Sequence, residues 1–162
     1  MIESERIRTV FNFDRLTGIL TWKVATSRKI RVGAVAGCPD GKGYIVVGID
    51  NKQYMAHRVA WKHMFGEWPT NKIDHRNGDR CDNSELNIRD VSDAINSQNQ
   101  VRPPINSSSG LLGVSWDAVR QKWTAHISLN GKATNLGRFD DKHEAYAVYL
   151  EAKRRLHEGC TI

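Results

Sequence analysis

Residues 73–99 read IDHRNGDRCDNSELNIRDVSDAINSQN, and the rest of the chain is organised around this stretch. A short apolar strand at 72–73 leads into the acid–base pair Asp74-His75. A polar loop rich in turn-forming residues follows, and residues 86–89 are expected to form a second short strand. The two strands therefore predict a hairpin whose first strand ends in a carboxylate and an imidazole.

A short helix is predicted directly after this hairpin. Ser92 or Asp93 can cap it, because both side chains accept hydrogen bonds from the unpaired N–H groups of a first helical turn. Asn99 lies about one turn beyond Asn96 and faces either the same side as Asn96 or the solvent. The two strands and the helix are expected to direct four side chains to one point: Asp74, His75, Asn87 and Asn96.

These four residue types suit the metal-assisted hydrolysis of a phosphodiester. Carboxylate and amide oxygens are hard ligands, and Mg²⁺ binds few of them while it keeps several waters and substrate phosphate oxygens. A histidine that titrates near neutral pH can take a proton from an attacking water. A second amide or a backbone carbonyl can hold that imidazole in one tautomer. Each residue alone could equally end a strand or cap a turn, so the prediction depends on their joint arrangement.

The order and spacing of these motifs resemble the HNH nucleases, and in particular the phage homing-endonuclease branch in which the last histidine is replaced by asparagine. The resemblance covers about residues 40–100. The motifs that carry it are Ile-Asp-His at 73–75, Asn-Gly-Asp-Arg at 77–80, Asp-Asn at 82–83, Asn-Ile-Arg at 87–89, Asn-Ser-Gln-Asn at 96–99, and the upstream run AHRVAW at 56–61 with Gly66 and Pro69.

This resemblance implies a ββα-metal (His-Me finger) site. In such a site Asp74 and Asn96 would bind one divalent ion, Mg²⁺ or Mn²⁺, and the ion would support the leaving 3′ oxygen of the cleaved strand. His75 would be the general base, and Asn87 would orient its ring. His57, in the upstream run, is expected to pack against the site rather than to bind the ion.

The composition favours a polyanionic partner. The chain has 162 residues, a formal net charge of +6 and a pI of about 9.4, so it either binds a polyanion or simply has a basic surface. No membrane span is expected, since no run of about 18 apolar residues occurs, and the N-terminus lacks a signal-peptide core. Cys38, Cys81 and Cys160 form no CxxC pair. We therefore expect no structural zinc and a reduced, cytoplasmic setting, which is the host bacterial cytoplasm if the protein is phage-encoded.

The region before the central stretch is predicted to be small and rich in β-structure. A short helix or arm at 2–11 precedes a hairpin at 13–24, and a strand follows at 44–49. Residues 56–65 fit a helix that Gly66 ends.

Residues 101–109, VRPPINSSS, are expected to form a linker, since the Pro-Pro pair is stiff and the serine run is flexible. We therefore predict an α+β protein of two parts. The first is an HNH nuclease domain at 1–100, with its ββα-metal core at about 72–100. The second is a DNA-binding domain at 110–162.

The second part is predicted to be a three-stranded antiparallel sheet packed on one helix. Asn130-Gly131 is a strong hairpin turn, and Asp140 or Asp141 can cap the helix. The expected strands are at 112–116, 123–129 and 132–139.

This part resembles the plant ethylene-response-factor (Apetala-type) DNA-binding domain, which implies that the sheet enters the major groove of DNA with the helix packed behind it. Alternation then places Ala125 and Ile127 against the helix and His126 on the outer face. Alternatively, the sheet only packs on the nuclease part. The residues that carry the resemblance are Gly113-Val114, WTAHI at 123–127, LGRF at 136–139 and Glu144-Ala145.

The candidate DNA contacts share a cationic or hydrogen-bonding side chain at a position expected to be exposed. The loop at 26–33 is either solvated or in contact with phosphates, and Arg89 can alternatively form a structural ion pair. The candidates are Arg28, Lys29, Arg31, Arg80, Arg89, Arg102, Ser115, Arg120, Lys122, Thr124, His126, Ser128, Lys132 and Asn135.

These observations predict a metal-dependent HNH endonuclease that hydrolyses double-stranded DNA, as a phage homing enzyme or a free-standing nicking enzyme. A monomer with one site per chain would nick its substrate unless it dimerises or cuts in two steps. The alternatives are a DNA-binding regulatory protein whose nuclease centre is inactive, and a structural or packaging protein that uses DNA as a scaffold.

Overall fold

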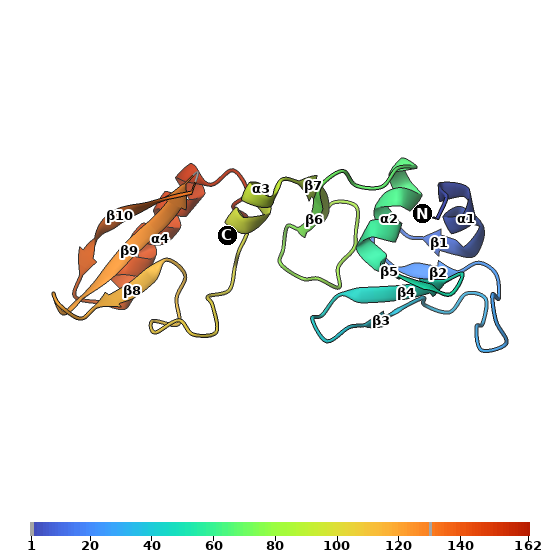
Figure 1. Cartoon of the computed structure of the whole chain (residues 1–162), viewed down its shortest axis with the longest axis horizontal. Helices are drawn as coiled ribbons and strands as arrows, with labels where there is room; N and C mark the ends of the chain where they lie inside the picture. The colour runs from blue at the N-terminus through green and yellow to red at the C-terminus, as the bar shows by residue number, and fades with distance from the viewer. Residues whose placement is uncertain (1, 130) are drawn as a thin grey trace. The chain divides into compact units, whose positions relative to one another are not determined.

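The computed structural model describes residues 2–129 and 131–162. The chain has an α+β fold and forms two compact units, Met1–Val91 and Ser92–Ile162 (Figure 1). In the parts of the chain that are described, every helix is too short or too polar to cross a lipid bilayer.

The first unit begins with a helix and a hairpin. Helix α1 (Ser4–Val10) leads directly into strand β1 (Phe11–Phe13), which pairs antiparallel with β2 (Leu20–Trp22). The rings of Phe11 and Trp22 lie opposite each other in this ladder, with their centroids 4.8 Å apart. The predicted helix and hairpin are both present, and they supply one side of the core of this unit.

A three-stranded sheet follows, in the order β3 (Cys38–Pro39), β4 (Ile45–Ile49) and β5 (Lys52–Met55). The turn between β4 and β5 places Asp50 and Asn51 at positive φ, a conformation that these short polar residues tolerate. Asp50 also accepts a hydrogen bond from the Arg6 side chain at 2.7 Å, which ties this turn to α1.

Helix α2 (Ala56–Phe65) has the predicted bounds. Gly66 ends it with φ of 81°, and its N–H donates to the Lys62 carbonyl oxygen in a left-handed cap. Val59 and Ala60 are fully buried. The helix packs against α1 and the β4–β5 hairpin. Its buried Ala60 also belongs to a core cluster with Ile73 and Ile88, so the helix supports the central stretch.

The central hairpin consists of β6 (Lys72–His75) and β7 (Ile88–Val91), which pair antiparallel. The expectation of a second strand at 86–89 is shifted by two residues. Leu86 lies in the loop with 84% of its surface exposed, whereas Ile88 is buried and pairs with His75. The apolar character of Leu86 suggested a strand position, but the buried side chain of this strand is Ile88.

The second unit begins with helix α3 (Asp93–Gln98), and the Ser92 hydroxyl caps it by accepting from the Ile95 N–H, as predicted. The observed unit boundary differs from the predicted linker at 101–109, because α3 bonds to the C-terminal segment. The Gln98 side-chain oxygen accepts from the Gly159 N–H at 2.9 Å, and the Gln100 carbonyl accepts from Lys153.

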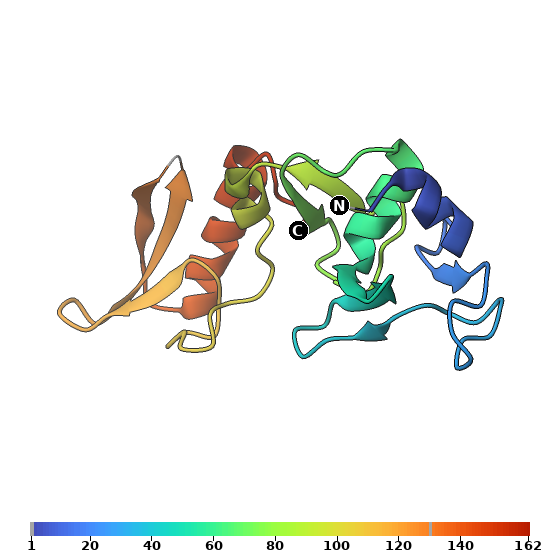
Figure 2. The ribbon, with the colours of Figure 1, turned by 45° about the vertical axis from the view of Figure 1, so that its right-hand side comes forward.

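The predicted C-terminal sheet is confirmed. Its order is β10 (Lys132–Phe139), β9 (Lys122–Leu129) and β8 (Val114–Asp117). Helix α4 (Lys142–Leu156), capped by Asp141, packs on one face of this sheet (Figure 2). Asn130, half of the predicted hairpin turn, lies outside the described residues.

Burial along β9 follows the predicted alternation. Ala125 and Ile127 are at most 1% exposed and pack toward α4, while His126 and Ser128 are exposed. Gly113, just before β8, has φ of 66°, and a Cβ atom there would lie 2.1 Å from the Tyr149 ring. A glycine is therefore required for α4 to approach the start of the sheet.

Candidate active site

His75 ends β6 and is buried, with 4% of its surface exposed. Its Nε2 atom lies 3.1 Å from the Asn83 side-chain oxygen, and Asn83 is itself 3% exposed. An amide oxygen can only accept, so this contact places a proton on Nε2 and leaves Nδ1 as the basic nitrogen. The hairpin and its loop thus hold the imidazole in a fixed orientation.

Asn87 has a different role from the one expected. Its side-chain oxygen accepts from the Asn77 N–H at 2.9 Å, and its side-chain amide donates to the Asp82 carbonyl at 2.6 Å. Asn87 therefore braces the loop, while Asn83 makes the contact with His75. Asn83 could not be recognised in the sequence as a partner of His75, because an Asp-Asn-Ser run is typical of ordinary turns.

Asp74 is 6% exposed and lies opposite Arg89 in the β6–β7 ladder. One carboxylate oxygen of Asp74 accepts from Arg89 Nε at 2.9 Å and from Arg89 Nη2 at 2.8 Å. This is the structural ion pair that the sequence left open for Arg89. The pairing fixes the orientation of the Asp74 carboxylate, and Asp74 directly precedes His75 in the same strand.

A layer of rings lies against the buried imidazole. The His57 ring meets the His75 ring edge-on, with centroids 5.3 Å apart, and the Tyr44 ring lies 5.3 Å from His57 and 6.0 Å from His75. The Arg80 guanidinium lies 4.8 Å from the centroid of the Tyr44 ring, and Arg80 Nη1 donates to the Lys42 carbonyl at 2.8 Å. Residues from α2, from the central loop and from the position just before β4 therefore lie against one side of His75.

His57 is an uncharged member of this layer. Burial, and then the proximity of His75 and Arg58, lower the pKa of His57 to about 4. Its Nδ1 atom is buried and has no hydrogen-bond partner within the described residues. Because His57 is neutral at pH 7, it places no positive charge next to the His75 ring.

The donor chemistry of the predicted metal ligands fits a divalent hard ion. Asp74 offers a carboxylate and Asn96 an amide oxygen, the two kinds of donor that Mg²⁺ and Mn²⁺ accept. Asn96 lies on α3, in the second unit, so its role as a ligand stays a prediction. Among residues 2–129 and 131–162, no three His, Cys, Asp or Glu side chains form a metal-binding group, which is compatible with a site that uses one carboxylate and one amide.

The predicted DNA contacts of the first unit differ in whether their side chains already bond to other groups of the protein. Arg28, Lys29 and Arg31 are exposed on the loop between β2 and β3. Arg80 is exposed but bound to a backbone carbonyl, and Arg89 is engaged by Asp74. The loop cations are therefore the ones best placed to meet a phosphate.

The predicted contacts of the second unit also divide into two groups. Arg120 pairs with Asp117 at 3.1 Å, Lys122 pairs with Asp140, and the Asn135 side-chain oxygen accepts from the Gly137 N–H at a bulge in β10. Ser115 and Thr124 are half-buried on β8 and β9. Arg102, His126, Ser128 and Lys132 are exposed and make none of these side-chain contacts.

Comparison with known proteins supports the nuclease reading of the central stretch. The family profile described as "HNH endonuclease" matches residues 54–98, which include α2, the β6–β7 hairpin and α3. Protein 3.8 of Escherichia phage T7 is 31% identical over 102 residues, which cover 62% of this chain and 83% of that protein.

No solved structure matches this chain, and nothing in the comparisons supports the ethylene-response-factor resemblance of the second unit. The length and identity of the match to the phage protein nevertheless establish kinship, and the profile identifies the central domain. The chain belongs to the family of phage T7 protein 3.8 and carries an HNH endonuclease domain.

Proposed function

We propose that this protein is a metal-dependent endonuclease that cleaves a phosphodiester bond of double-stranded DNA. The observation that carries the proposal is the buried His75 ring, oriented by Asn83 at 3.1 Å and next in sequence to the buried carboxylate of Asp74. A fixed imidazole next to a hard anionic ligand is the arrangement that metal-assisted hydrolysis requires.

In the proposed reaction, His75 Nδ1 takes a proton from a water whose oxygen attacks the phosphorus. The bond from phosphorus to the 3′ oxygen breaks, and the Asn83 contact keeps the proton on Nε2, so that Nδ1 is the nitrogen with the basic lone pair. A divalent ion held by Asp74 and Asn96 would supply positive charge at the phosphate and the leaving oxygen. Arg89 positions the Asp74 carboxylate for that task.

The second unit is proposed to hold the duplex. Its exposed His126, Ser128 and Lys132 lie on the outer face and edge of the sheet, as an Apetala-type DNA-binding domain would present them. The exposed cations of the 26–33 loop would add phosphate contacts that do not depend on sequence. With one such site per chain, the product is a nick, as expected of a homing or free-standing nicking enzyme.

The test is incubation of supercoiled plasmid with the purified full-length protein. We expect conversion to open circles with Mg²⁺ or Mn²⁺ and none after chelation by EDTA. Ligation of the products would then show a 5′ phosphate and a 3′ hydroxyl. Cleavage that continues at the same rate in EDTA would refute the metal-dependent mechanism.

One observation favours a second function, that of a DNA-binding regulatory protein with an inactive centre. Two nitrogens of Arg89, Nε and Nη2, donate to the same carboxylate oxygen of Asp74. This ion pair would compete with a metal ion for that carboxylate. Salt-sensitive binding to the plasmid, with no nicking in either metal, would support this reading.

A further inference from the structure

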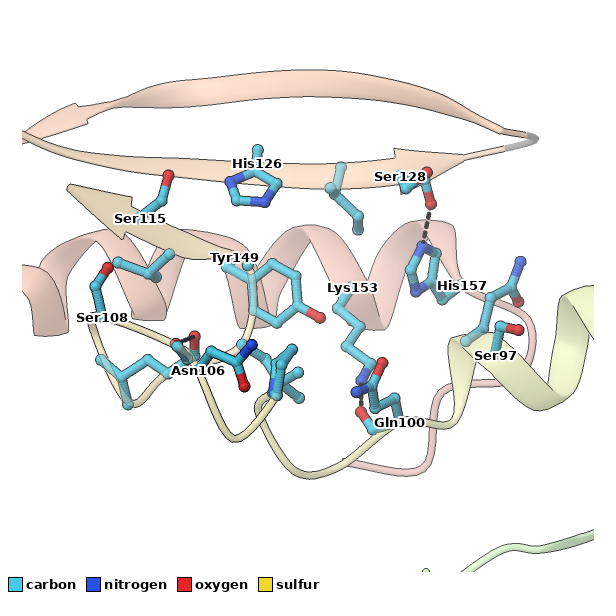
Figure 3. Close-up of a pocket in the computed structure, with 18 of the residues that line it drawn as sticks. Ser97, Gln100, Asn106, Ser108, Ser115, His126, Ser128, Tyr149, Lys153 and His157 are labelled. Atoms are coloured by element: carbon cyan, nitrogen blue, oxygen red, sulfur yellow. Dashed lines mark hydrogen bonds between the residues drawn. The ribbon is translucent and has the colours of Figure 1, made fainter. Parts of the chain in front are cut away.

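The second unit contains a pocket that the nuclease chemistry does not use. Its volume is about 680 Å³, and it lies where the segment before β8 passes beneath α4 and the end of β9 (Figure 3). Pockets of about 300–1,000 Å³ are typical of small-molecule sites. This one is therefore large enough for a ligand of nucleotide size.

One wall of the pocket is a row of polar side chains on α4 and just beyond it. Tyr149, Lys153 and His157 follow one another at intervals of four residues, so they share one side of the helix (Figure 3). The facing wall comes from residues 97–115 and combines hydroxyl and amide groups with the apolar side chains of Leu111, Leu112 and Val114. It includes Ser97, Gln100, Asn106 and Ser108.

The lining is rich in donors and poor in negative charge. Of the described residues that form it, none is Asp or Glu, whereas Lys153 and His157 can carry positive charge. Such a lining favours an anion over a cation.

Lys153 is the strongest sign of a ligand. It is 1% exposed, and its ammonium group donates to the Gln100 carbonyl and lies 5.9 Å from the centre of the Tyr149 ring. Burial lowers its pKa, and no carboxylate pairs with it in the described chain. A buried lysine without a carboxylate partner is unusual, because desolvation of the charge is costly.

His157 offers a second contact. Its Nε2 atom lies 2.9 Å from the Ser128 carbonyl oxygen, whereas its Nδ1 atom is buried and has no hydrogen-bond partner within the described residues. A buried polar atom of this kind calls for an absent partner. A phosphate monoester can supply it, because its oxygens accept from a protonated ring and its O–H donates to a neutral one.

We propose that this pocket binds a phosphate-bearing ligand of nucleotide size, with Lys153 as its main charged contact. The phosphate belongs either to a free nucleotide or to a DNA strand. The site is separate from the β6–β7 centre, and the proposal does not depend on nuclease activity.

The test is a titration of the full-length protein, without divalent metal, followed by amide chemical shifts. The probes are thymidine monophosphate, thymidine without phosphate, and a short single-stranded oligonucleotide. We expect saturable shifts at residues 149–157 with a phosphate-bearing probe, and at least about tenfold weaker binding of thymidine. Saturation by the mononucleotide identifies a free nucleotide as the source, and saturation by the oligonucleotide alone identifies a DNA strand.

The variant Lys153→Met removes the charge but keeps the length of the side chain, and we expect it to weaken phosphate binding by about tenfold or more. Lys142→Met, on the same helix but outside the pocket lining, is the matched control. If Lys153→Met does not fold, His157→Phe serves as the second variant. Equal binding of thymidine and its monophosphate, unchanged binding in both pocket variants, or no saturation by any probe would overturn the proposal.

Discussion

The β6–β7 hairpin and the pocket beneath α4 differ in whether their buried polar groups have partners within the described part of the chain. In the hairpin, Asp74 is paired with Arg89 and His75 with Asn83 inside the first unit. In the pocket, Lys153 has no carboxylate partner in the described chain, and one ring nitrogen of His157 has no partner there. The hairpin is organised before any substrate arrives, whereas the pocket has bonding capacity that a ligand could use.

The largest effect is expected when the His75 imidazole is removed from the hairpin, which tests whether this preorganised group is the catalytic one. We expect His75→Ala to lower the nicking rate by about 10²–10⁴-fold, the usual contribution of a general base, with DNA binding retained. Plasmid nicking and a gel-shift assay measure the two effects. His63→Ala, which removes a half-buried histidine from α2, is the control, and equal losses in both variants would contradict the assignment.

The ion pair of the hairpin is expected to contribute strongly to stability. Arg89→Met would leave the buried Asp74 carboxylate without this partner, at a cost of about 3 kcal/mol in the free energy of unfolding. Arg120→Met, which breaks the exposed pair with Asp117, should leave the free energy of unfolding nearly unchanged. Urea denaturation of both variants makes the measurement, and similar losses would show that burial does not matter here.

The neutral His57 predicts a pH dependence of stability. Its pKa is about 4 in the folded chain and near 6.5 in the unfolded chain, so the unfolded chain gains its proton at the higher pH. Its contribution is therefore complete above pH 6.5 and is lost as the pH falls toward 4, by at most about 3 kcal/mol. Urea denaturation at several pH values, compared with His57→Phe, isolates this loss. Parallel curves for the two proteins would contradict it.

The smallest predicted effect distinguishes the roles of two asparagines in the loop of the hairpin, Asn83 and Asn87. Asn83→Ala should lower kcat by about 10–100-fold with little change in KM, because the imidazole loses its orienting contact. Asn87→Ala should instead act mainly on thermal stability, since Asn87 bonds to the loop backbone at both ends of its amide. A loss of kcat in Asn87→Ala and a loss of thermal stability alone in Asn83→Ala would instead support Asn87 as the residue that orients the His75 ring.

Local patterns predicted much of the fold. The bounds of α2 followed from apolar spacing and Gly66, the start of α3 from the Ser92 cap, and the faces of β9 from strict alternation. These features depend on near neighbours in sequence, which is why they could be predicted.

Contacts between distant segments were harder to predict. The register of β7 could not be derived from Leu86, an apolar residue that the fold leaves exposed. The roles of Asn83 and Asn87 depend on how a twelve-residue polar loop, 76–87, folds back on itself, and composition does not determine that path. The pocket likewise requires residues 97–115 to meet α4, about forty positions later in the chain.

The bonds between α3 and the C-terminal segment have a practical consequence. Gln98 is tied to Gly159 and Asn99 to Thr161, so the final residues anchor the helix that carries Asn96. Removal or replacement of these final residues is therefore not a neutral change. It would loosen the helix that carries a proposed metal ligand more than sixty positions upstream.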